Sequence, residues 1–552
     1  MINSVKNVPN RKLSDNNVTV DEFSNYFVDS VEHIRSKTHC SKISAGTFLS
    51  NVKQKNCVFT WRPVSNLELY QLVMDLSNSR SQDHYGFSNH LIKSIVHVIL
   101  DPLVFIINQC LDQGEFPDCL KISKVIPVFK KGNTSIVSNY RPISMVPVLS
   151  KVIESVMLKQ LIGYFEENEL LYDDQFGFRP GRSTTMAMER VVDWILGKLE
   201  DKQIAMACAY DLTKAFDCLP HSVIIDKLTF YGVLGKESSL IKSYLSNRQQ
   251  YVEIEGKSSS LRSVNSGVPQ GSILGPFLFI LTVNDMPASI PDKVVSYADD
   301  TTVLKVIKNN NFDTTELTKL MSNWFSANGL SLNTSKTETV IFRLNTNLNT
   351  SEPIKLLGFW LDGKLTWKRH TEEICKTLSK TLYLLRCLRQ LLPANALLSA
   401  YYGFFHNHLN YGVLLWGNSA GAKKVFLLQK KAIRIITSSA STEHCRPIFK
   451  KLRILTLASL FVLANIMFMF DKTDKMSTHK DIHAHNTRGN QNIVVPKSRL
   501  NTTTSSHIVM SVKLFNKLPS EIKTIKSIDT FKLKVKAILL EKKLLYCPRI
   551  YG

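Results

Sequence analysis

Residues 292–307 read DKVVSYADDTTVLKVI, which places two adjacent carboxylates, Asp299 and Asp300, between two β-rich runs. Such runs on either side of a short polar break predict a β-hairpin with its tight turn at the two aspartates. A third carboxylate, Asp211, lies at the end of another β-rich run, IAMACAYDL, 88 positions before Asp299. If these strands are neighbours in one sheet, the three carboxylates meet.

Three convergent carboxylates predict a site for hard divalent cations. Oxygen-only ligands suit Mg²⁺, which keeps coordination positions free for water and substrate phosphates. Two such ions about 3.5–4 Å apart can activate a hydroxyl and stabilise a leaving pyrophosphate. An Asp-Asp pair is also common in turns without a ligand, so a solvated turn is the alternative for these two residues taken alone.

The composition narrows the class of partner. The chain has 552 residues, of which 44% are hydrophobic, so it can fold, and its length predicts three or four domains. Residues 361–552 contain 32 Lys and Arg against 10 Asp and Glu, a surplus of 22, whereas residues 1–360 contain 37 against 36. This asymmetry favours a polyanionic partner for the last third.

Several classes of protein are disfavoured. The N-terminus is polar and the ten cysteines include no CxxC pair, so we expect neither a secretory signal, a disulfide scaffold nor a zinc knuckle. These features predict a location in the nucleus or cytoplasm and not secretion. Residues 454–470, ILTLASLFVLANIMFMF, are at the short edge of membrane-spanning length and predict a buried core helix.

Further motifs stand in a fixed order around the three carboxylates. They are residues 139–144 (NYRPIS), 175–184 (QFGFRPGRST), 211–217 (DLTKAFD), 266–272 (SGVPQGS), 297–300 (YADD), 329–333 (GLSLN) with Lys336, and 356–358 (LLG). Together these motifs resemble those of the reverse transcriptases, and most closely those of non-LTR (LINE-type) retrotransposons of the jockey-like group. The resemblance is strong over about residues 120–365.

The resemblance implies an α+β right-hand polymerase fold of fingers, palm and thumb. On that basis we expect an N-terminal helical extension over 1–119 and fingers and palm over 120–345. A primer-grip-like segment would follow over 346–370, and a basic helical thumb and C-terminal region over 371–552. Intact relatives carry an N-terminal endonuclease, and no nuclease motif is recognisable before residue 120.

The resemblance also assigns roles to individual residues. Asp211, Asp299 and Asp300 would hold the metal ions, and Lys336 would be the general acid toward pyrophosphate. The nucleotide-binding residues would be Arg141, Phe216 (the steric gate), Gln270, Gly271, Lys130 and Lys131. The nucleic-acid-binding residues would be Arg179, Arg182, Leu357 and Gly358, joined by the basic residues Lys430, Lys431 and Arg434 of a predicted helix. A core position for Phe216 and solvated positions for the lysines and loop arginines are the alternatives.

The implied activity is RNA-directed DNA polymerase, which adds dNTPs to a primer 3′-OH by two-metal phosphoryl transfer during retrotransposition. The implied cofactor is two Mg²⁺ ions, with Mn²⁺ as an alternative. Expected partners are an RNA template, a DNA primer, the RNA–DNA duplex, dNTPs and an endonuclease supplied in trans, and no membrane. Two other functions stay open: an inactive retroelement remnant that binds RNA, and an intron-type maturase.

Overall fold

The structure is a computed structural model that describes residues 18–38, 43–308, 312–344, 352–482 and 491–541. The chain divides into two compact units. The first comprises residues 1–183, 210–303 and 312–337, and the second comprises residues 184–209, 304–311 and 338–552. Part of the segment expected to lead into the primer grip, residues 345–351, lies outside the described residues.

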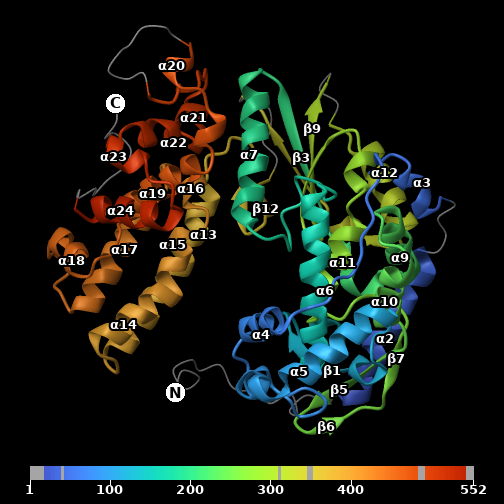
Figure 1. Ribbon diagram of the computed structural model, residues 1–552. Helices are drawn as coiled ribbons and strands as arrows, with labels where there is room; N and C mark the ends of the chain where they lie inside the picture. The colour runs from blue at the N-terminus through green and yellow to red at the C-terminus, as the bar shows by residue number, and fades with distance from the viewer. Residues whose placement is uncertain (1–17, 39–42, 309–311, 345–351, 483–490, 542–552) are drawn as a thin grey trace. The chain divides into compact units, whose positions relative to one another are not determined.

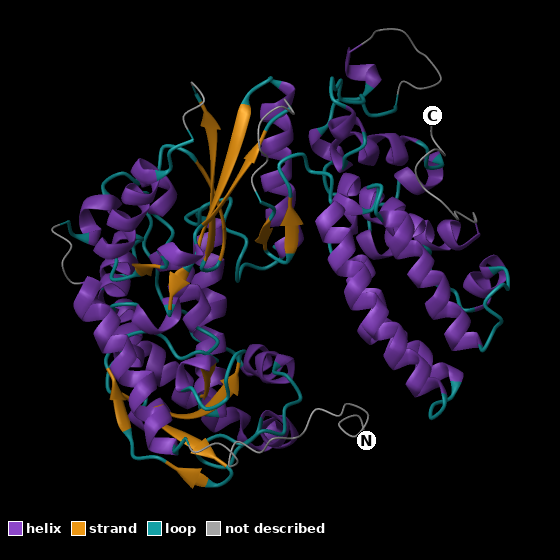
Figure 2. Cartoon of the chain, turned by 180° about the vertical axis from the view of Figure 1, so that it is seen from behind, coloured by secondary structure: helices purple, strands orange, loops and turns teal. Residues whose placement is uncertain are grey.

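A five-stranded sheet organises one end of the first unit (Figure 1 and Figure 2). Its strands are β1 (Ile122–Phe129), β2 (Tyr140–Met145), β5 (Arg248–Ile254), β6 (Lys257–Ser258) and β7 (Arg262–Val264). The order is β2-β1-β5-β6, and β7 also pairs with β5. β1 is antiparallel to β2 and parallel to β5, with Val125 opposite both Ser144 and Val252.

The N-terminal helix α2 (Val20–Thr38) packs on this sheet. Phe23 and Phe27 on one face of the helix form a core with Val125, Tyr140 and Val252. Tyr140 meets Phe23 edge to face, with ring centroids 4.9 Å apart. Burying these side chains joins the N-terminal segment to the strands that follow residue 120, so α2 is part of the first unit's core.

Helices make up most of the rest of the first unit. They are α3 (Ala45–Leu49), α4 (Asn66–Asp75), α5 (Asn89–Gln113), α6 (Val148–Glu167), α8 (Ala215–Cys218), α9 (His221–Phe230), α10 (Gly235–Leu245), α11 (Gly275–Thr282) and α12 (Thr315–Ala327), with short 3₁₀ turns at Asp118–Lys121, Val137–Asn139, Met286–Ser289 and Thr334–Lys336. Among the described residues, α5 alone has the length and hydropathy of a membrane-crossing helix, a test that core helices of soluble proteins also pass. It packs against α4, α6 and α10.

The predicted hairpin around the two aspartates is formed by β8 (Lys293–Tyr297) and β9 (Asp300–Ile307). The turn differs by one position from the prediction: Ala298 and Asp299 form it, and Asp300 begins β9. Ala298 takes a left-handed φ of 57°, the conformation that closes such tight turns. A second pairing, β4 (Leu212–Thr213) with β10 (Ser331–Leu332), connects the segment after Asp211 to the segment before Lys336.

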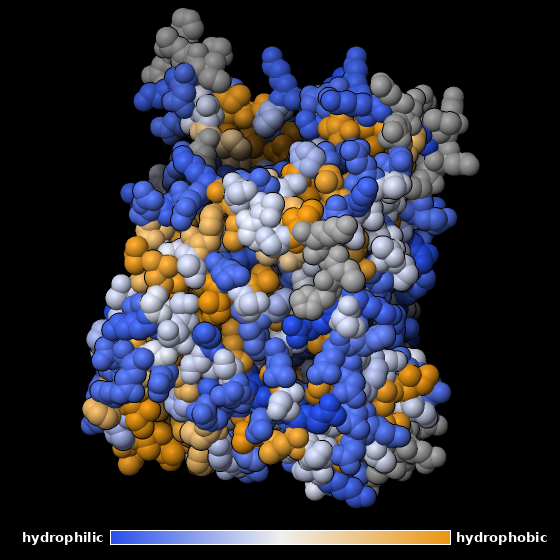
Figure 3. Space-filling model, turned by 90° about the vertical axis from the view of Figure 1, so that its right-hand side faces the viewer, coloured by the Kyte–Doolittle hydropathy of each residue, from blue (hydrophilic) through white to orange (hydrophobic). Residues whose placement is uncertain are grey.

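In the second unit, strand β3 (Ile204–Tyr210) is antiparallel to β11 (Glu338–Phe342), and β12 (Ile354–Leu356) forms a hairpin with β13 (Phe359–Leu361). The helices are α7 (Thr184–Glu200), α13 (Lys368–Arg389), α14 (Ala394–Tyr401), α15 (Asn407–Asn410), α16 (Val413–Trp416), α17 (Ala422–Thr437), α18 (Cys445–Lys451), α19 (Leu457–Phe470), α20 (His479–Ile482), α21 (Asn501–Thr504), α22 (His507–Asn516), α23 (Ser520–Lys523) and α24 (Ile528–Glu541), with a π-helical turn at Tyr402–His406 and a 3₁₀ turn at Thr473–Lys475. The apolar segment over 454–470 forms α19, capped by Thr456 and packed against α22 and α24. Hydrophilic and apolar side chains alternate in small patches on the face in Figure 3.

A buried ion pair stands at the centre of the first unit. Lys227 of α9 donates to the carboxylate of Asp285 and to the carbonyl of Thr282, and both charged side chains are 0% exposed. Trp324 of α12 covers the ammonium, 4.7 Å from its ring centroid, and donates from Nε1 to the same carboxylate at 3.2 Å. Each charge is thus compensated by the other within the core.

We expect Lys227→Met to destabilise the protein by about 3–5 kcal/mol, because it leaves the Asp285 carboxylate buried without its cation. Urea denaturation of the full chain measures the loss. The double variant Lys227→Met/Asp285→Leu removes both charges and should recover part of it. A single variant as stable as the wild type would contradict this account of the core.

Candidate active site

The Asp211 carboxylate lies close enough to Asp299 and Asp300 for its charge to affect the pKa of both. Burial, together with the negative charges of Asp299 and Asp211, raises the pKa of Asp300 to about 6. Burial and the Asp211 charge likewise raise the pKa of Asp299, against the opposing charges of Arg141 and Lys130. Three acidic groups that repel one another favour a bound cation.

The three carboxylates do not yet form a coordination shell. Within the part of the chain that the structure describes, no three Asp, Glu, His or Cys side chains converge closely enough to hold a metal ion. Strand β3, which ends one residue before Asp211, is a neighbour of β9, which begins at Asp300, so the prediction that these strands share a sheet is confirmed. Joint coordination of a metal ion by the three carboxylates stays a prediction. The oxygen-only donor set fits Mg²⁺, provided that the Asp211 side chain turns toward the hairpin.

Lys336 explains where Asp211 points. Its Nζ donates to Asp211 Oδ2 at 2.7 Å, and the backbone N–H of Asn333 donates to the Asp211 carbonyl at 2.9 Å. The β4–β10 pairing brings the two segments together. Lys336 is 57% exposed and Asp211 33%, so the pair is worth only about 0–1 kcal/mol and can open readily. The Lys336 ammonium thus neutralises the Asp211 carboxylate at the position where a metal ion would do so.

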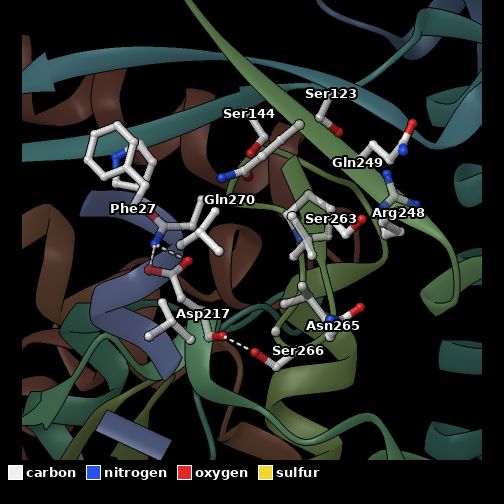
Figure 4. Close-up of a pocket in the computed structure, with 18 of the residues that line it drawn as sticks. Phe27, Ser123, Ser144, Asp217, Arg248, Gln249, Ser263, Asn265, Ser266 and Gln270 are labelled. Atoms are coloured by element: carbon white, nitrogen blue, oxygen red, sulfur yellow. Dashed lines mark hydrogen bonds between the residues drawn. The ribbon is translucent and has the colours of Figure 1, made fainter. Parts of the chain in front are cut away.

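A second carboxylate in the first motif, Asp217, has a role that sequence reasoning missed. The Gln270 side-chain amide donates to both of its oxygens, at 2.8 and 2.9 Å, and Ser266 Oγ donates to its backbone carbonyl at 3.3 Å (Figure 4). Burial raises the pKa of Asp217, while the Gln270 hydrogen bond and nearby Lys214 and Arg141 lower it. Asp217 therefore fixes the orientation of Gln270; its place in the same motif as Asp211 was the available signal.

Two glycines of the 266–272 loop allow it to pack closely against the backbone of Asp217 and of Ser144. A Cβ on Gly267 would lie 2.4 Å from the Asp217 carbonyl oxygen, and one on Gly271 would lie 2.3 Å from the Ser144 carbonyl oxygen. Both have left-handed φ, 76° and 134°, which favours glycine. The Ser144 N–H donates to the Gln270 carbonyl at 2.8 Å, so Gln270 is attached to the five-stranded sheet on one side and to Asp217 on the other.

Phe216 lies beside this loop pair. Its ring stacks on Phe279 of α11, with centroids 4.7 Å apart and planes inclined at 26°, and it meets Phe178 edge to face at 6.0 Å. The side chain is half-buried. One face of the Phe216 ring therefore packs against Phe279, in agreement with the alternative that Phe216 is a core residue. Its role as a steric gate stays a prediction.

The basic residues predicted to bind the nucleotide are on the β1–β2 hairpin. Arg141 of β2 lies opposite Val128 of β1 and is exposed, and the Lys130 N–H donates to the Asn139 carbonyl at 2.8 Å. Arg141 lowers the pKa of both Asp217 and Asp299, which places its charge within reach of both motifs. Lys131 is exposed in the connecting turn.

Arg179 and Arg182, the two arginines of the 175–184 loop, both make hydrogen bonds within the protein. Arg179 is 7% exposed, and its Nε and Nη2 donate to the two carboxylate oxygens of Glu166 at 2.8 and 2.6 Å. Arg182 Nη1 donates to the Asp173 carbonyl at 2.9 Å, and its guanidinium lies over Phe176. These contacts hold the 175–184 loop in shape, while template contacts by these arginines stay predictions.

The remaining predicted residues belong to the second unit. Leu357 and Gly358 form the turn of the β12–β13 hairpin, where Tyr411 Oη donates to the Leu357 carbonyl at 2.6 Å. On α17, Lys430 lies over the Phe426 ring. The guanidinium of Arg434, on the same helix, donates to the Glu443 carbonyl at 2.9 and 2.6 Å. Lys431 is exposed. Arg434 thus has a structural contact that the basic-face prediction did not include.

Comparison with known proteins supports the motif assignment. Residues 128–361 match the family model described as reverse transcriptase (RNA-dependent DNA polymerase). The chain is 28% identical to the RNA-directed DNA polymerase from mobile element jockey of Drosophila melanogaster, over 70% of this chain and 45% of that protein. It is 29% identical to the Drosophila funebris jockey polymerase, over 68% and 44%, and 26% identical to the probable polymerase from transposon X-element, over 77% and 48%.

The chain thus spans less than half the length of these relatives. A solved structure, apo telomerase from Candida tropicalis, is 15% identical with a TM-score of 0.34, covers 44% of this chain and 54% of its own, and is too dissimilar to bear on the fold. The family match, the named relatives and the ordered motifs agree with one another. Residues 128–361 therefore match the reverse transcriptase family, and the relatives named here are RNA-directed DNA polymerases of mobile elements.

Proposed function

We propose that this chain is an RNA-directed DNA polymerase that adds dNTPs to a primer 3′-OH in retrotransposition. The observation that carries the proposal is that Asp211 directly follows β3, while Asp299 and Asp300 stand at the start of the neighbouring strand β9, all within the matched residues. Their mutual repulsion is what a cation-dependent phosphoryl-transfer site needs before its metal binds. Two bound Mg²⁺ ions, or Mn²⁺ in their place, would lower the pKa of the 3′-OH and offset charge on the leaving pyrophosphate.

The chain's own residues would orient the substrates and move the proton. Arg141, on the exposed side of β2, can bind the triphosphate and stack on the base, since a guanidinium is planar and charged. Gln270, held by Asp217, would contact the base pair being formed. Lys336, once released from Asp211, carries an ammonium proton that it can donate to the pyrophosphate oxygen as the bond to the α-phosphorus breaks.

The proposal extends to partners and location. An RNA template, a DNA primer and their duplex are the expected polyanionic partners, and the surplus of 22 positive charges in residues 361–552 suits a sequence-independent phosphate grip. A separate endonuclease could supply the primer end. A location in the nucleus or cytoplasm stays a prediction.

Two competing functions are distinguished by simple assays. An inactive remnant would bind RNA and incorporate nothing, whereas a maturase would bind one structured intron RNA far more tightly than an unrelated RNA. The intact motif residues favour the polymerase.

Primer extension on poly(rA)/oligo(dT) with dTTP and Mg²⁺ tests the proposal. We expect Asp299→Asn to lower incorporation by about 1,000-fold or more, since it weakens the metal ligand set while keeping the shape of the turn. Circular dichroism and thermal denaturation should show an unchanged fold. Equal incorporation by variant and wild type would rule out Asp299 as a metal ligand.

We expect Phe216→Val to increase incorporation of ribonucleotides relative to deoxyribonucleotides by about 10- to 100-fold, because a smaller side chain removes the clash with a 2′-hydroxyl. Competition between rUTP and dTTP on the same template measures the ratio. Phe178→Val is the matched control, since Phe178 contacts the same ring from its edge. If Phe216→Val lowers stability without changing the ratio, Phe216 is a core residue only.

We expect Lys336→Gln to bind Mn²⁺ about two- to fivefold more tightly than the wild type, because the ammonium no longer competes for Asp211. The same variant should incorporate dTTP more slowly at saturating metal, since it has lost its proton donor. Calorimetric titration measures the metal affinity, with Lys319→Gln, an exposed lysine on α12, as control. Weaker metal binding by Lys336→Gln would contradict the competition.

A further inference from the structure

A pocket with both polar and apolar lining residues opens in the first unit between α2, the strands β1, β2, β5 and β7, and the loop before α11 (Figure 4). Figure 4 shows Ser123, Gln249 and Arg248 on one side of it and Asp217 and Gln270 on the other. Asp211, Asp299 and Asp300 are not among its lining residues. The pocket therefore adjoins Gln270, although it is separate from the carboxylate cluster.

Two buried polar groups in the pocket wall lack a partner. Arg248 is 3% exposed; its Nη1 donates to the Tyr244 carbonyl at 3.1 Å and its guanidinium lies over the Tyr244 ring. Its Nη2 makes no hydrogen bond to any residue that the structure describes, and neither does Ser123 Oγ, whose side chain is 4% exposed. A buried guanidinium nitrogen without a hydrogen-bond partner is costly, and a hydroxyl of the same pocket wall in the same condition is a second sign of a missing ligand.

The formal charges of the pocket lining balance, so the unpaired donors rather than the net charge favour an anion. Its acidic lining residues are Glu32, which is exposed on α2, and Asp217, whose oxygens accept from Gln270. Its basic lining residues are Arg248 and Arg35. Burial lowers the pKa of nearby His221, and the charges of both arginines lower it further. The two guanidinium groups therefore act on one region of the protein.

We propose that this pocket binds a backbone phosphate of the template strand, with Arg248 Nη2 and Ser123 Oγ as its donors. A planar guanidinium and a hydroxyl together match the oxygens of a phosphodiester. The assignment rests on the polymerase function proposed above, because that function requires a strand to pass Gln270.

The template strand fits better than the incoming nucleotide for a geometric reason. The triphosphate that reacts must reach the metal-binding carboxylates, and none of these lines the pocket. The unpaired template just beyond the nascent base pair must instead lie next to Gln270, which the pocket shares. A phosphate held there would fix the path of the unpaired template.

Ser123 provides the cleanest variants, because its hydroxyl has no partner within the described residues to lose. We expect Ser123→Ala to weaken binding of a primer–template with a single-stranded RNA overhang by about fivefold and Ser123→Asp by at least about tenfold. For a blunt duplex of the same paired length, both variants should match the wild type. Fluorescence anisotropy in EDTA measures binding without catalysis.

Two further readouts support the design. Ser123→Asp should raise the melting temperature of the free protein, because its carboxylate can pair with Arg248, and should lower the salt slope of overhang binding by about 0.7. Ser258→Asp is the matched control: it adds the same charge to an exposed position of the same sheet, outside the pocket. It should bind both substrates as the wild type does.

The possible results separate the two proposals. If Ser123→Asp binds the overhang as tightly as the wild type does, the pocket assignment is wrong, even if the wild type incorporates dTTP. If the Ser123 variants bind inorganic tripolyphosphate more weakly but bind the overhang substrate as the wild type does, the pocket binds free phosphates. The template assignment is then overturned. If the wild type binds the overhang through Ser123 and incorporates nothing, the pocket stands and the polymerase function fails.

Discussion

Repulsion among the carboxylates of Asp211, Asp299 and Asp300 is the constraint on which the site depends. Burial is the main cause that raises the pKa of Asp299 and of Asp300, and the charge of Asp211 acts in the same direction on both. The surrounding cations reduce the cost of assembling these charges: Lys336 bonds to Asp211 directly, while Arg141 and Lys130 act on Asp299 at longer range. On the function proposed here, a bound cation would offset the remaining negative charge of these carboxylates.

The rigid parts of the first unit serve to position this cluster. The left-handed Ala298 sets the hairpin turn, and the β4–β10 pairing brings Lys336 to Asp211. The close approaches at Gly267 and Gly271 leave room for the hydrogen bonds that attach Gln270 to β2 and to Asp217. The Lys227–Asp285 pair holds α9 and the segment after α11 beneath them. The functional residues are therefore on short loops whose ends are fixed by buried contacts.

Much of this could be predicted from local sequence. The hairpin 292–307, the buried strand ending at Tyr210 and the apolar helix over 454–470 follow from alternation and apolar runs, because short-range side-chain patterns determine such elements. The reverse transcriptase resemblance was confirmed by the family match and the jockey relatives. Contacts between distant positions could not be predicted: Gln270 bonds to a carboxylate 53 positions away, and Arg179 is buried against Glu166. Nor does sequence show that Arg248 and Ser123 are buried without partners, since that depends on the whole surrounding pocket.

The most direct measurement is incorporation of dTTP on poly(rA)/oligo(dT) by the purified full chain as a function of Mg²⁺ concentration. The account predicts that incorporation rises from zero in EDTA to a plateau, with an RNA template supporting synthesis. Absence of incorporation at every Mg²⁺ and Mn²⁺ concentration, under conditions in which a related polymerase is active, would contradict the assignment of this carboxylate cluster as a working polymerase site.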